Sequence, residues 1–453
     1  MRSKASPPRR GYFFQPAVFV LACLLCLSGP VASGAAAAGE SLPVTPVQRA
    51  QLDLLHGAEN EGLEPSDYAP DELERLAGLA EDLVYAQFSQ RLDEAFARYS
   101  RDLSQGRLDP ALDPGWRLLR QPRDANDPLP AFDTAAQVEA FKETLLLPPH
   151  PQYRRLRNAL QQLIDIRARD GWPLIPAGDD LHAGTRDERV IPLRNRLRIS
   201  GHYTAEMQAD PLYFDAGLDA AVRRFQAEHA LWIDGAVGAR TLEALNVPVE
   251  KRIEQVKITL ERWRWLPRNP GDRYIRVNTV AAELQVIEFD KPLLSMRAIV
   301  GRAYRQTPSL QGYIDQVTFN PTWTVPHTIA VEDLLPQQRL DKTFLARNRV
   351  RIFSAQDGRE VDIQEVDWAN MTPRNFAYTL RQDAGPNNSL GRLRFSFKNP
   401  YDIYLHDSPD KILFRLPDRT SSSGCIRIEE PVLLAEYLLA SDQQMYSEAI
   451  QAA

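Results

Sequence analysis

The chain has 453 residues and a formal net charge of −6; 25 % of its residues are charged and 43 % are hydrophobic. These proportions are ordinary for folded globular domains, and the length is enough for about three of them. They exclude a low-complexity or strongly charged chain, and since the sequence has no basic tract we expect no nucleic-acid partner. The residue pattern indicates neither a metal site nor an organic cofactor.

The N-terminus has the pattern of a secretory signal peptide. Basic residues such as Arg2 and Arg10 precede an apolar run at 17–27, and a stretch of small residues follows it. We predict that 1–38 is removed and that the protein is exported to the periplasm or cell envelope. The apolar run is shorter than the ~20 residues of a membrane span, so we expect no stable span after cleavage. The alternatives are an uncleaved anchor and lipidation, and lipidation is disfavoured because Cys23 lies inside the apolar run.

Residues 43–170 have mostly helical spacing of apolar residues, and we predict a helical scaffold domain there. Segments 71–106 and 150–171 are amphipathic, and each ends at a glycine. The stretch 107–134 between them is rich in Pro and Asp and is predicted as a loop.

A second helical module is predicted at 178–247, after a linker rich in Pro and Gly. It contains the pattern FQ-x₂-H-x-L-x₂-DG-x₂-G-x₂-T, formed by Phe225, Gln226, His229, Leu231, Asp234, Gly235, Gly238 and Thr241. This pattern resembles the peptidoglycan-binding module. The same positions would also form the packing skeleton of a small three-helix domain, so they predict the fold more directly than they predict binding.

The last part of the chain begins with a predicted linker helix at 248–271. Its Trp263 and Trp265 either stack on sugar rings or pack the joint between domains, and we favour the joint. From 272 to 447 the apolar pattern changes to a period of two, which predicts a β-rich domain. An interruption at 322–384 has the character of an insertion, which in a β-rich domain is often a lid or a binding loop.

Cysteine usage directs attention to one thiol. Cys23 and Cys26 lie in the predicted leader, so Cys425 is the single cysteine of the predicted mature chain. It has no partner for an internal disulfide, and an unused thiol is a liability in an oxidising compartment. We predict that Cys425 is a nucleophile. The alternative is a buried structural cysteine that behaves as a small hydrophobic residue.

A histidine precedes this cysteine by 19 positions, with a loop between them. The segment before His406 alternates like a half-buried strand, the middle is rich in Pro, Asp, Ser and Gly, and a strand-like run resumes at Cys425. Two adjacent strand ends can bring a thiol and an imidazole within hydrogen-bond reach. We also expect Gly424 to turn the backbone beside the sulfur and to leave amide groups free for an oxyanion.

The segment resembles the active-site signature of the L,D-transpeptidases with a YkuD-type catalytic domain. In that family a His is followed by Ser/Thr-His-Gly-Cys and a strand that carries an Arg; here His406 is followed by the sequence SSGCIR at 422–427. Ser423 replaces the second His, a change found in the YcbB-like branch, and GLEPSDY at 62–68 and SRDLSQGRLDP at 100–110 resemble the scaffold domain of that branch. The resemblance implies a multidomain α+β protein, in which a capping insertion covers the active site and His406 is the one nearby base.

The resemblance further implies acyl transfer on peptidoglycan stem peptides. Cys425 would attack a donor tetrapeptide with His406 as proton acceptor and donor, release D-alanine, and pass the thioester to an amine to give a 3-3 cross-link. A backbone carbonyl usually holds the second imidazole nitrogen, and we expect the Asp407 side chain to point to the opposite face. The implied partners are peptidoglycan stem peptides and glycan. The alternatives are a hydrolytic L,D-carboxypeptidase, a lipoprotein-detaching peptidase and a non-catalytic peptidoglycan-binding scaffold.

Four further residues are candidates for oxyanion or substrate binding: Gly424, Arg427, Ser423 and Tyr404. Arg427 lies on the same face as Cys425 if the segment is extended, and it either binds a stem carboxylate or forms a structural salt bridge. Tyr404 either lines the site or belongs to the core. Of the three serines at 421–423, we expect at least one to cap the turn.

Overall fold

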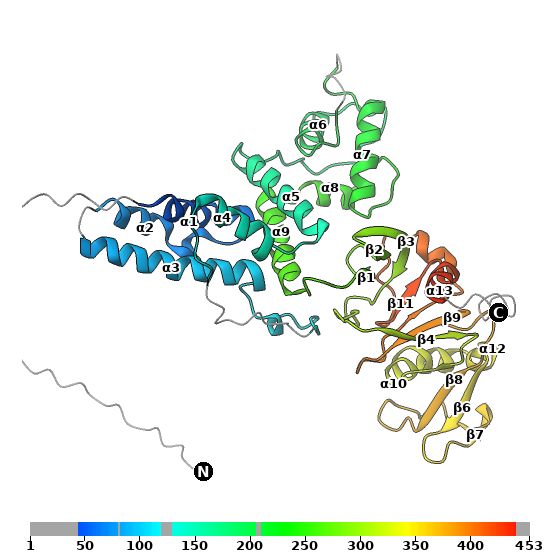
Figure 1. Ribbon diagram of the computed structural model, residues 1–453. Coiled ribbons are helices and arrows are strands. Elements are labelled where there is room, and N and C mark those ends of the chain that lie inside the picture. Colours follow the sequence, from blue (N-terminus) through cyan, green and yellow to red (C-terminus); the bar gives the residue numbers. More distant parts are fainter. Residues whose placement is uncertain (1–43, 80–81, 119–128, 205–209, 441–453) are drawn as a thin grey trace, which may run out of the picture.

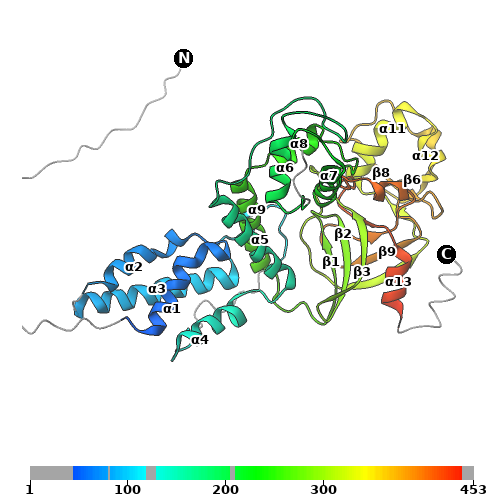
Figure 2. The same ribbon diagram turned by 90° about the horizontal axis from the view of Figure 1, so that it is seen from above.

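The computed structural model describes residues 44–79, 82–118, 129–204 and 210–440. The predicted signal peptide at 1–38 lies outside these residues. The described chain is helical in its first half and β-rich in its last part, which confirms the predicted α+β class. In Figures 1 and 2 a bundle of helices lies at one end of an elongated molecule and the sheets lie at the other.

The bundle at the N-terminal end has one apolar core. Its elements are α1 (Pro46–His56), α2 (Pro70–Ala77), α3 (Asp82–Gln105) and α4 (Ala135–Phe141), with short turns η1 (Gly57–Glu61), η2 (Pro65–Tyr68), η3 (Pro110–Leu112) and η4 (Lys142–Leu146). Thr45 and Gln48 form a capping box that starts α1. Leu52, Phe88 and Phe96 are fully buried between the helices, as expected from their helical spacing.

Two long helices connect this bundle to the rest of the chain. Helices α5 (Pro151–Arg167) and α9 (Val249–Trp265) run side by side in both views. Between them the buried Arg264 donates to the Tyr153 hydroxyl and pairs with Glu261 at 3.1 Å. A buried charge is stable only with such partners, so this contact holds α9 against α5.

The module that follows α5 has the described helices α6 (Val190–Ile199), α7 (Ala216–Glu228) and α8 (Ala239–Leu245). The Gln226 side chain is buried and donates to Asp234 at 2.8 Å and Thr241 at 3.2 Å, while its oxygen accepts from the Gly235 amide at 2.9 Å. His229 stacks on Phe225 with 3.8 Å between ring centroids. The residues of the FQ…DG…T pattern therefore hold the module together.

The C-terminal domain is built on a seven-stranded sheet with the order β1-β2-β3-β11-β10-β9-β4. The strands are β1 (Arg273–Asn278), β2 (Glu283–Glu288), β3 (Lys291–Ile299), β4 (Ile314–Phe319), β9 (Leu393–Phe397), β10 (Leu405–His406) and β11 (Ile426–Ile428). Strands β10 and β11 are parallel, and η7 (Lys411–Arg415) lies in the connection between them. Helix α13 (Pro431–Leu439) buries Leu434 and Ala435 against the sheet.

The predicted insertion contains a second sheet with the order β5-β8-β6-β7. Its elements are β5 (Trp323–Thr324), α10 (His327–Ile329), η5 (Ala330–Leu334), α11 (Leu335–Leu340), α12 (Phe344–Arg347), β6 (Val350–Ser354), β7 (Glu360–Val361), η6 (Ile363–Glu365) and β8 (Tyr378–Gln382). Leu335, Leu345 and Leu380 belong to its separate apolar core. It extends beyond the main sheet, in yellow in Figure 1.

Two further observations concern the helices. Trp265 is buried and meets Trp116 of the N-terminal part edge to face, with 5.0 Å between ring centroids, so the prediction that the tryptophans of α9 pack a joint is confirmed. Over the residues described here, every helix is too short or too polar to cross a bilayer.

Candidate active site

The site is built on the parallel pair β10 and β11. Leu405 is opposite Ile426 and His406 is opposite Arg427, so Tyr404 lies beside Cys425 one position earlier. Side chains alternate along a strand, so residues 404 and 406 share a face with residues 425 and 427. The strand–loop–strand pattern correctly predicts that these two strand ends are neighbours, with the histidine at the end of β10 and the cysteine directly before β11.

The His406 imidazole is buried and held by the backbone. Its Nδ1 lies 2.5 Å from the carbonyl oxygen of Asp407. A carbonyl only accepts, so Nδ1 carries the proton and the lone pair of the neutral ring is on Nε2. Burial, followed by the nearby Arg427, lowers the pKa of His406 to about 3, although the carbonyls of Asp407 and Leu390 act in the opposite direction. The ring is therefore neutral at physiological pH.

The Cys425 thiol is half-buried and points to a different carbonyl. Its Sγ donates to the carbonyl oxygen of Asp402 at 3.6 Å. The backbone of Asp402 has a φ of +52°, a left-handed conformation that residues other than Gly rarely adopt. Burial raises the pKa of Cys425, while the amide and hydroxyl of Tyr404 lower it less strongly. The thiol is therefore protonated at rest.

The predicted hydrogen bond between the Cys425 thiol and the His406 imidazole is therefore not formed in this structure, where the thiol donates to the Asp402 carbonyl instead. Cys425 and His406 lie on one face of adjacent strands but at diagonal positions, and the sulfur proton points at Asp402. In enzymes without substrate, catalytic hydrogen bonds are often long and tighten when substrate binds.

Gly424 has the conformation that the sequence predicts but not the free amide. Its φ is +118°, where a side chain would be strained, and an added Cβ would lie 3.2 Å from Ile403. Its N–H donates to the Ser422 Oγ at 3.1 Å, so this amide is not free. The Ser422 hydroxyl in turn donates to the Cys425 carbonyl at 2.6 Å. The expectation that one of the serines caps the turn is confirmed, and that serine is Ser422.

Ser423, at the position of the family's second His, is held by two arginines that the sequence analysis did not identify. Its Oγ accepts from Arg302 at 2.6 Å and from Arg305 at 3.0 Å. Thr307 donates to the Gly424 carbonyl at 2.8 Å. The segment 300–307 therefore fixes the conformation of the loop that presents Cys425.

The same arginines connect this loop to the insertion. Arg305 pairs with Asp333 at 2.5 Å and also with Glu332, both on η5, and Arg302 lies 3.6 Å from Asp333. These carboxylates raise the pKa of Arg305 and keep it charged. A network of this kind couples the position of η5 to the position of Ser423.

Arg427 lies on the face of the thiol without an acidic partner. Its Nε is buried and has no hydrogen-bond partner, and no carboxylate lies within 4.0 Å of its guanidinium, among the residues that the structure describes. Burial lowers its pKa, and the negative charge of Asp410 acts in the opposite direction. The structural salt bridge considered above is therefore absent from the described residues, and the guanidinium is available for an anionic group.

Tyr404 lines the site, with a neighbour that sequence reasoning missed. Burial raises the pKa of its hydroxyl, the Cys425 thiol raises this pKa further and the Trp323 side chain of β5 lowers it. The Tyr404 ring lies 5.7 Å from that of His406. The Arg394 guanidinium, on the neighbouring strand β9, lies 5.5 Å from the Tyr404 ring. Tyr404 thus connects the nucleophile to the first strand of the insertion.

The Asp407 carboxylate has a structural role. Its oxygens accept from the amides of Ser408 and Arg392 and from the Lys411 ammonium at 2.7 to 2.9 Å. The prediction that its side chain points away from the imidazole agrees with these contacts. Only its backbone carbonyl contacts the His406 ring.

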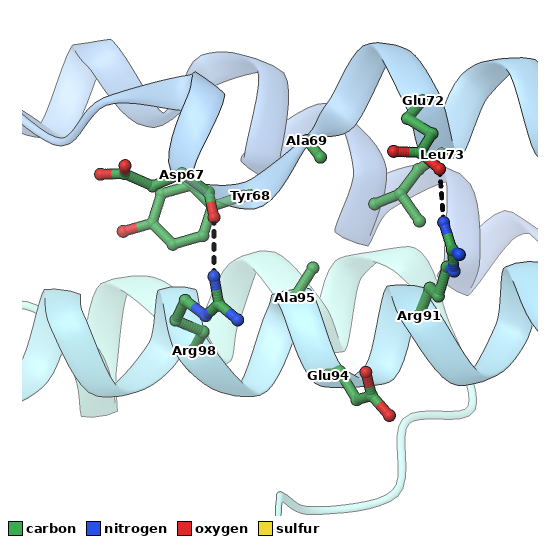
Figure 3. Close-up of a pocket in the computed structure, with 9 residues that line it drawn as sticks. All are labelled: Asp67, Tyr68, Ala69, Glu72, Leu73, Arg91, Glu94, Ala95 and Arg98. Carbon is green, nitrogen blue, oxygen red and sulfur yellow. Dashed lines mark hydrogen bonds and ion pairs between the residues drawn. The ribbon is translucent and has the colours of Figure 1, made fainter. Parts of the chain in front are cut away.

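Two of the cavities in the described structure are candidates for ligand binding. One, of about 310 Å³, is lined by Ser423 and Gly424 and by residues of the N-terminal part. The other, of about 150 Å³, lies between α2 and α3. In Figure 3 its charged groups meet one another: Arg91 reaches Glu72, and Arg98 reaches the Asp67 carbonyl at 3.0 Å. Its charges are therefore largely satisfied within the protein.

Comparison with known families agrees with this architecture. Residues 272–443 match the YkuD model, described as the L,D-transpeptidase catalytic domain. Residues 41–160 match the scaffold domain, and 186–245 match a domain described as "Putative peptidoglycan binding domain". These three matches define the class of the protein. The chain combines a YkuD-type L,D-transpeptidase catalytic domain with a scaffold domain and a peptidoglycan-binding-type module. The resemblance predicted from the sequence is confirmed.

One curated protein and one solved structure are similar to parts of this chain. A protein of Haemophilus influenzae described as "Putative L,D-transpeptidase" is 36 % identical over 165 residues, which are 36 % of this chain and 33 % of the relative. The match therefore spans about a third of the length of that relative. The crystal structure of residues 123–326 of the L,D-transpeptidase from Xylanimonas cellulosilytica is 17 % identical and covers 59 % of this chain and 94 % of that one, with a TM-score of 0.17.

Proposed function

We propose that the protein is a peptidoglycan L,D-transpeptidase with Cys425 as nucleophile and His406 as general base and acid. The observation that carries the proposal is the parallel register of β10 and β11, which gives the two residues a common face inside a domain of this family. The domain division predicted from the sequence, 43–170, 178–247, 248–271 and 272–447, is part of the proposal.

The reaction begins with two neutral groups. As Cys425 Sγ attacks the carbonyl of the third residue of a donor tetrapeptide, its proton passes to His406 Nε2 and the Nδ1–H stays on the Asp407 carbonyl. The imidazolium then gives its proton to the departing nitrogen of D-alanine, and a thioester remains. An amine of a second stem attacks the thioester carbonyl and loses its proton to His406. The C–S bond then breaks, His406 returns the proton to the sulfur of Cys425, and the new amide bond is the 3-3 cross-link.

The substrate contacts proposed for the site follow from the free donors. Arg427 binds a carboxylate of the stem, since its buried Nε lacks a partner in the described part of the chain. Tyr404 orients the thiol through its hydroxyl. A role for the Gly424 amide in an oxyanion hole requires that its bond to Ser422 opens, and a role for Ser423 requires release from the two arginines.

The insertion at 322–384 is proposed to close over the bound donor. Support comes from two contacts that connect it to the nucleophile: the Trp323 side chain with Tyr404, and η5 with Arg305. Closure would exclude water and so favour transfer to an amine over hydrolysis.

The proposed location is outside the cytoplasm, in the periplasm or cell envelope, where peptidoglycan lies. The family matches of the catalytic domain and the peptidoglycan-binding-type module support this location, and the predicted signal peptide would provide the export.

The proposal is tested by incubating the full chain with disaccharide tetrapeptides and determining the masses of the products. Cross-linked dimers with released D-alanine are expected. Disaccharide tripeptide without dimers would indicate the hydrolytic alternative. Unchanged substrate, with a melting temperature that shows a folded protein, would contradict an enzymatic role and favour the peptidoglycan-binding scaffold.

A further inference from the structure

The larger cavity joins two domains beside the nucleophile. Its walls come from the segment 114–117, which follows η3 in the scaffold domain, and from 305–308, 401–403 and 423–424 of the catalytic domain. Gly424 directly precedes Cys425, and the Cys425 thiol donates to the carbonyl of Asp402, which lies between the lining residues Tyr401 and Ile403. The cavity of about 310 Å³ therefore adjoins both segments that surround the nucleophile. In Figure 1 the cyan segment after α3 extends toward the catalytic domain.

The scaffold segment is firmly positioned. Arg117 donates its amide to the Ser309 carbonyl at 3.1 Å, and Ser309 donates to the Gly115 carbonyl at 2.8 Å, which forms a short parallel bridge between the domains. Arg262 of α9 donates to the Asp113 carboxylate at 2.8 and 3.1 Å. With Trp116 packed on α9 as described above, the backbone that carries Arg117 is fixed beside the cavity.

The charged side chains that line this cavity are all positive. Its charged lining residues are Arg117 and Arg305, and none of its lining residues is acidic. Arg305 is already paired with two carboxylates of η5. The Arg117 guanidinium donates to the Trp116 carbonyl at 3.0 Å and lies 6.0 Å from the Tyr401 ring, and no ion pair to it is found within the described ranges. An anion is the ligand that this arrangement favours.

We propose that this cavity binds a carboxylate of a peptidoglycan stem peptide, with Arg117 as its partner and with Tyr401 and Ile403 against the aliphatic part of the peptide. The assignment rests on the proposed function. It makes the scaffold domain a contributor to substrate binding, because Arg117 is 308 positions away from Cys425 in the sequence and reaches the site only through the interdomain bridge.

The test uses the full chain with Arg117→Glu and Arg117→Lys. The matched control is Arg101→Glu, which reverses an exposed arginine on α3 that does not line the cavity. We expect Arg117→Glu to raise the KM for stem peptide by about tenfold, the scale of one charge-assisted hydrogen bond. Arg117→Lys should retain most of the affinity, and Arg101→Glu should not differ from the wild type.

The source of the carboxylate is resolved with amidated substrates. If the donor supplies it, a donor with a C-terminal amide binds the wild type about tenfold more weakly, and Arg117→Glu causes no further loss. If the acceptor supplies it, the same pattern appears with an amidated acceptor when dimer formation is measured. Either pattern supports the cavity as a carboxylate site.

Failure of the cavity and failure of the proposed function are separable. Calorimetric binding of disaccharide tetrapeptide to the Cys425→Ala chain, with and without Arg117→Glu, needs no turnover. Equal affinity of the two chains, together with an unchanged KM for donor and acceptor in active Arg117→Glu enzyme, would overturn the cavity assignment and leave the transpeptidase proposal standing. If binding depends on Arg117 but the wild-type chain forms no product, the cavity assignment stands and the transpeptidase proposal is overturned.

Discussion

The Nδ1 of His406 donates to the carbonyl oxygen of the next residue, Asp407, over 2.5 Å. This contact fixes the tautomer of the ring with the lone pair on Nε2, without a carboxylate. The Asp407 carboxylate itself is bound to Lys411 and to two backbone amides. The His406 imidazole is therefore oriented by a backbone carbonyl, which carries no charge, and it stays neutral because it is buried.

Replacement of the nucleophile is expected to abolish every product. Cys425→Ala removes the sulfur but leaves Ser422, whose hydroxyl holds the loop through the Cys425 carbonyl, so the fold should persist. D-Alanine release, cross-linked dimers and tripeptide should all be undetectable while the circular dichroism spectrum is unchanged. D-Alanine release by the folded variant would rule out thiol chemistry.

Removal of the base should slow acylation rather than abolish it. His406→Ala is expected to lower the rate of thioester formation by roughly two to four orders of magnitude, the usual scale of general acid–base catalysis. The measurement is single-turnover D-alanine release. A loss smaller than about tenfold would show that another group takes the thiol proton.

The pH dependence of acylation should be flat on the acid side. The pKa of His406 is about 3, and burial raises the pKa of Cys425, so the active form carries a neutral ring and a protonated thiol. We expect kcat/KM to change little between pH 5 and pH 8, since the base is already deprotonated throughout this range. A decrease below pH 7 with an apparent pKa near 6.5 would instead indicate that the ring titrates at its ordinary value.

The same burial should make stability depend on pH. In the unfolded chain His406 titrates near 6.5, whereas in the folded chain it titrates near 3, so between these values the unfolded state binds the additional proton. Stability is therefore full above pH 6.5 and decreases as the pH falls toward 3. His406→Gln should lose less in melting temperature between pH 7 and pH 4 than the wild type; an equal loss would contradict the assignment.

The contact between the insertion and the catalytic loop should matter for rate. Asp333→Ala removes the 2.5 Å partner of Arg305 on η5 and is expected to lower acylation about three- to tenfold, the scale of a half-buried ionic network. The matched control is Glu365→Ala, an exposed carboxylate of the same insertion. Equal rates for the two variants would show that the network does not position the loop.

Several features were accessible from the sequence because they are local. The period of two before His406 and after Cys425 predicted two strands, and the loop composition predicted their connection, so the common face followed from alternation. The FQ…DG…T pattern predicted the three-helix module because Gln226 bonds to residues only 8 to 15 positions away. The signal for Trp265 as a joint residue was its size and its place on a linker helix.

Other features depend on contacts across long stretches of chain. Arg302 and Arg305 meet Ser423 over separations of 121 and 118 residues, and no spacing rule relates them. The prediction of a free Gly424 amide is wrong because Ser422 accepts a hydrogen bond from this amide, and the sequence does not reveal the orientation of the Ser422 hydroxyl. The second sheet was missed because its strands are short, as in β5 with two residues and β7 with two residues. The segment 107–134 was predicted only as a loop, although Arg117 within it lines the larger cavity.

The most direct test of the mechanism is intact-mass spectrometry of the full chain quenched within seconds of mixing with disaccharide tetrapeptide. An adduct with the mass of a disaccharide tripeptide acyl group is expected on the peptide that contains Cys425, and hydroxylamine should remove it as it removes thioesters. Cys425→Ala should carry no adduct. Formation of cross-linked product at full rate, with no adduct on Cys425 at any time, would contradict the account.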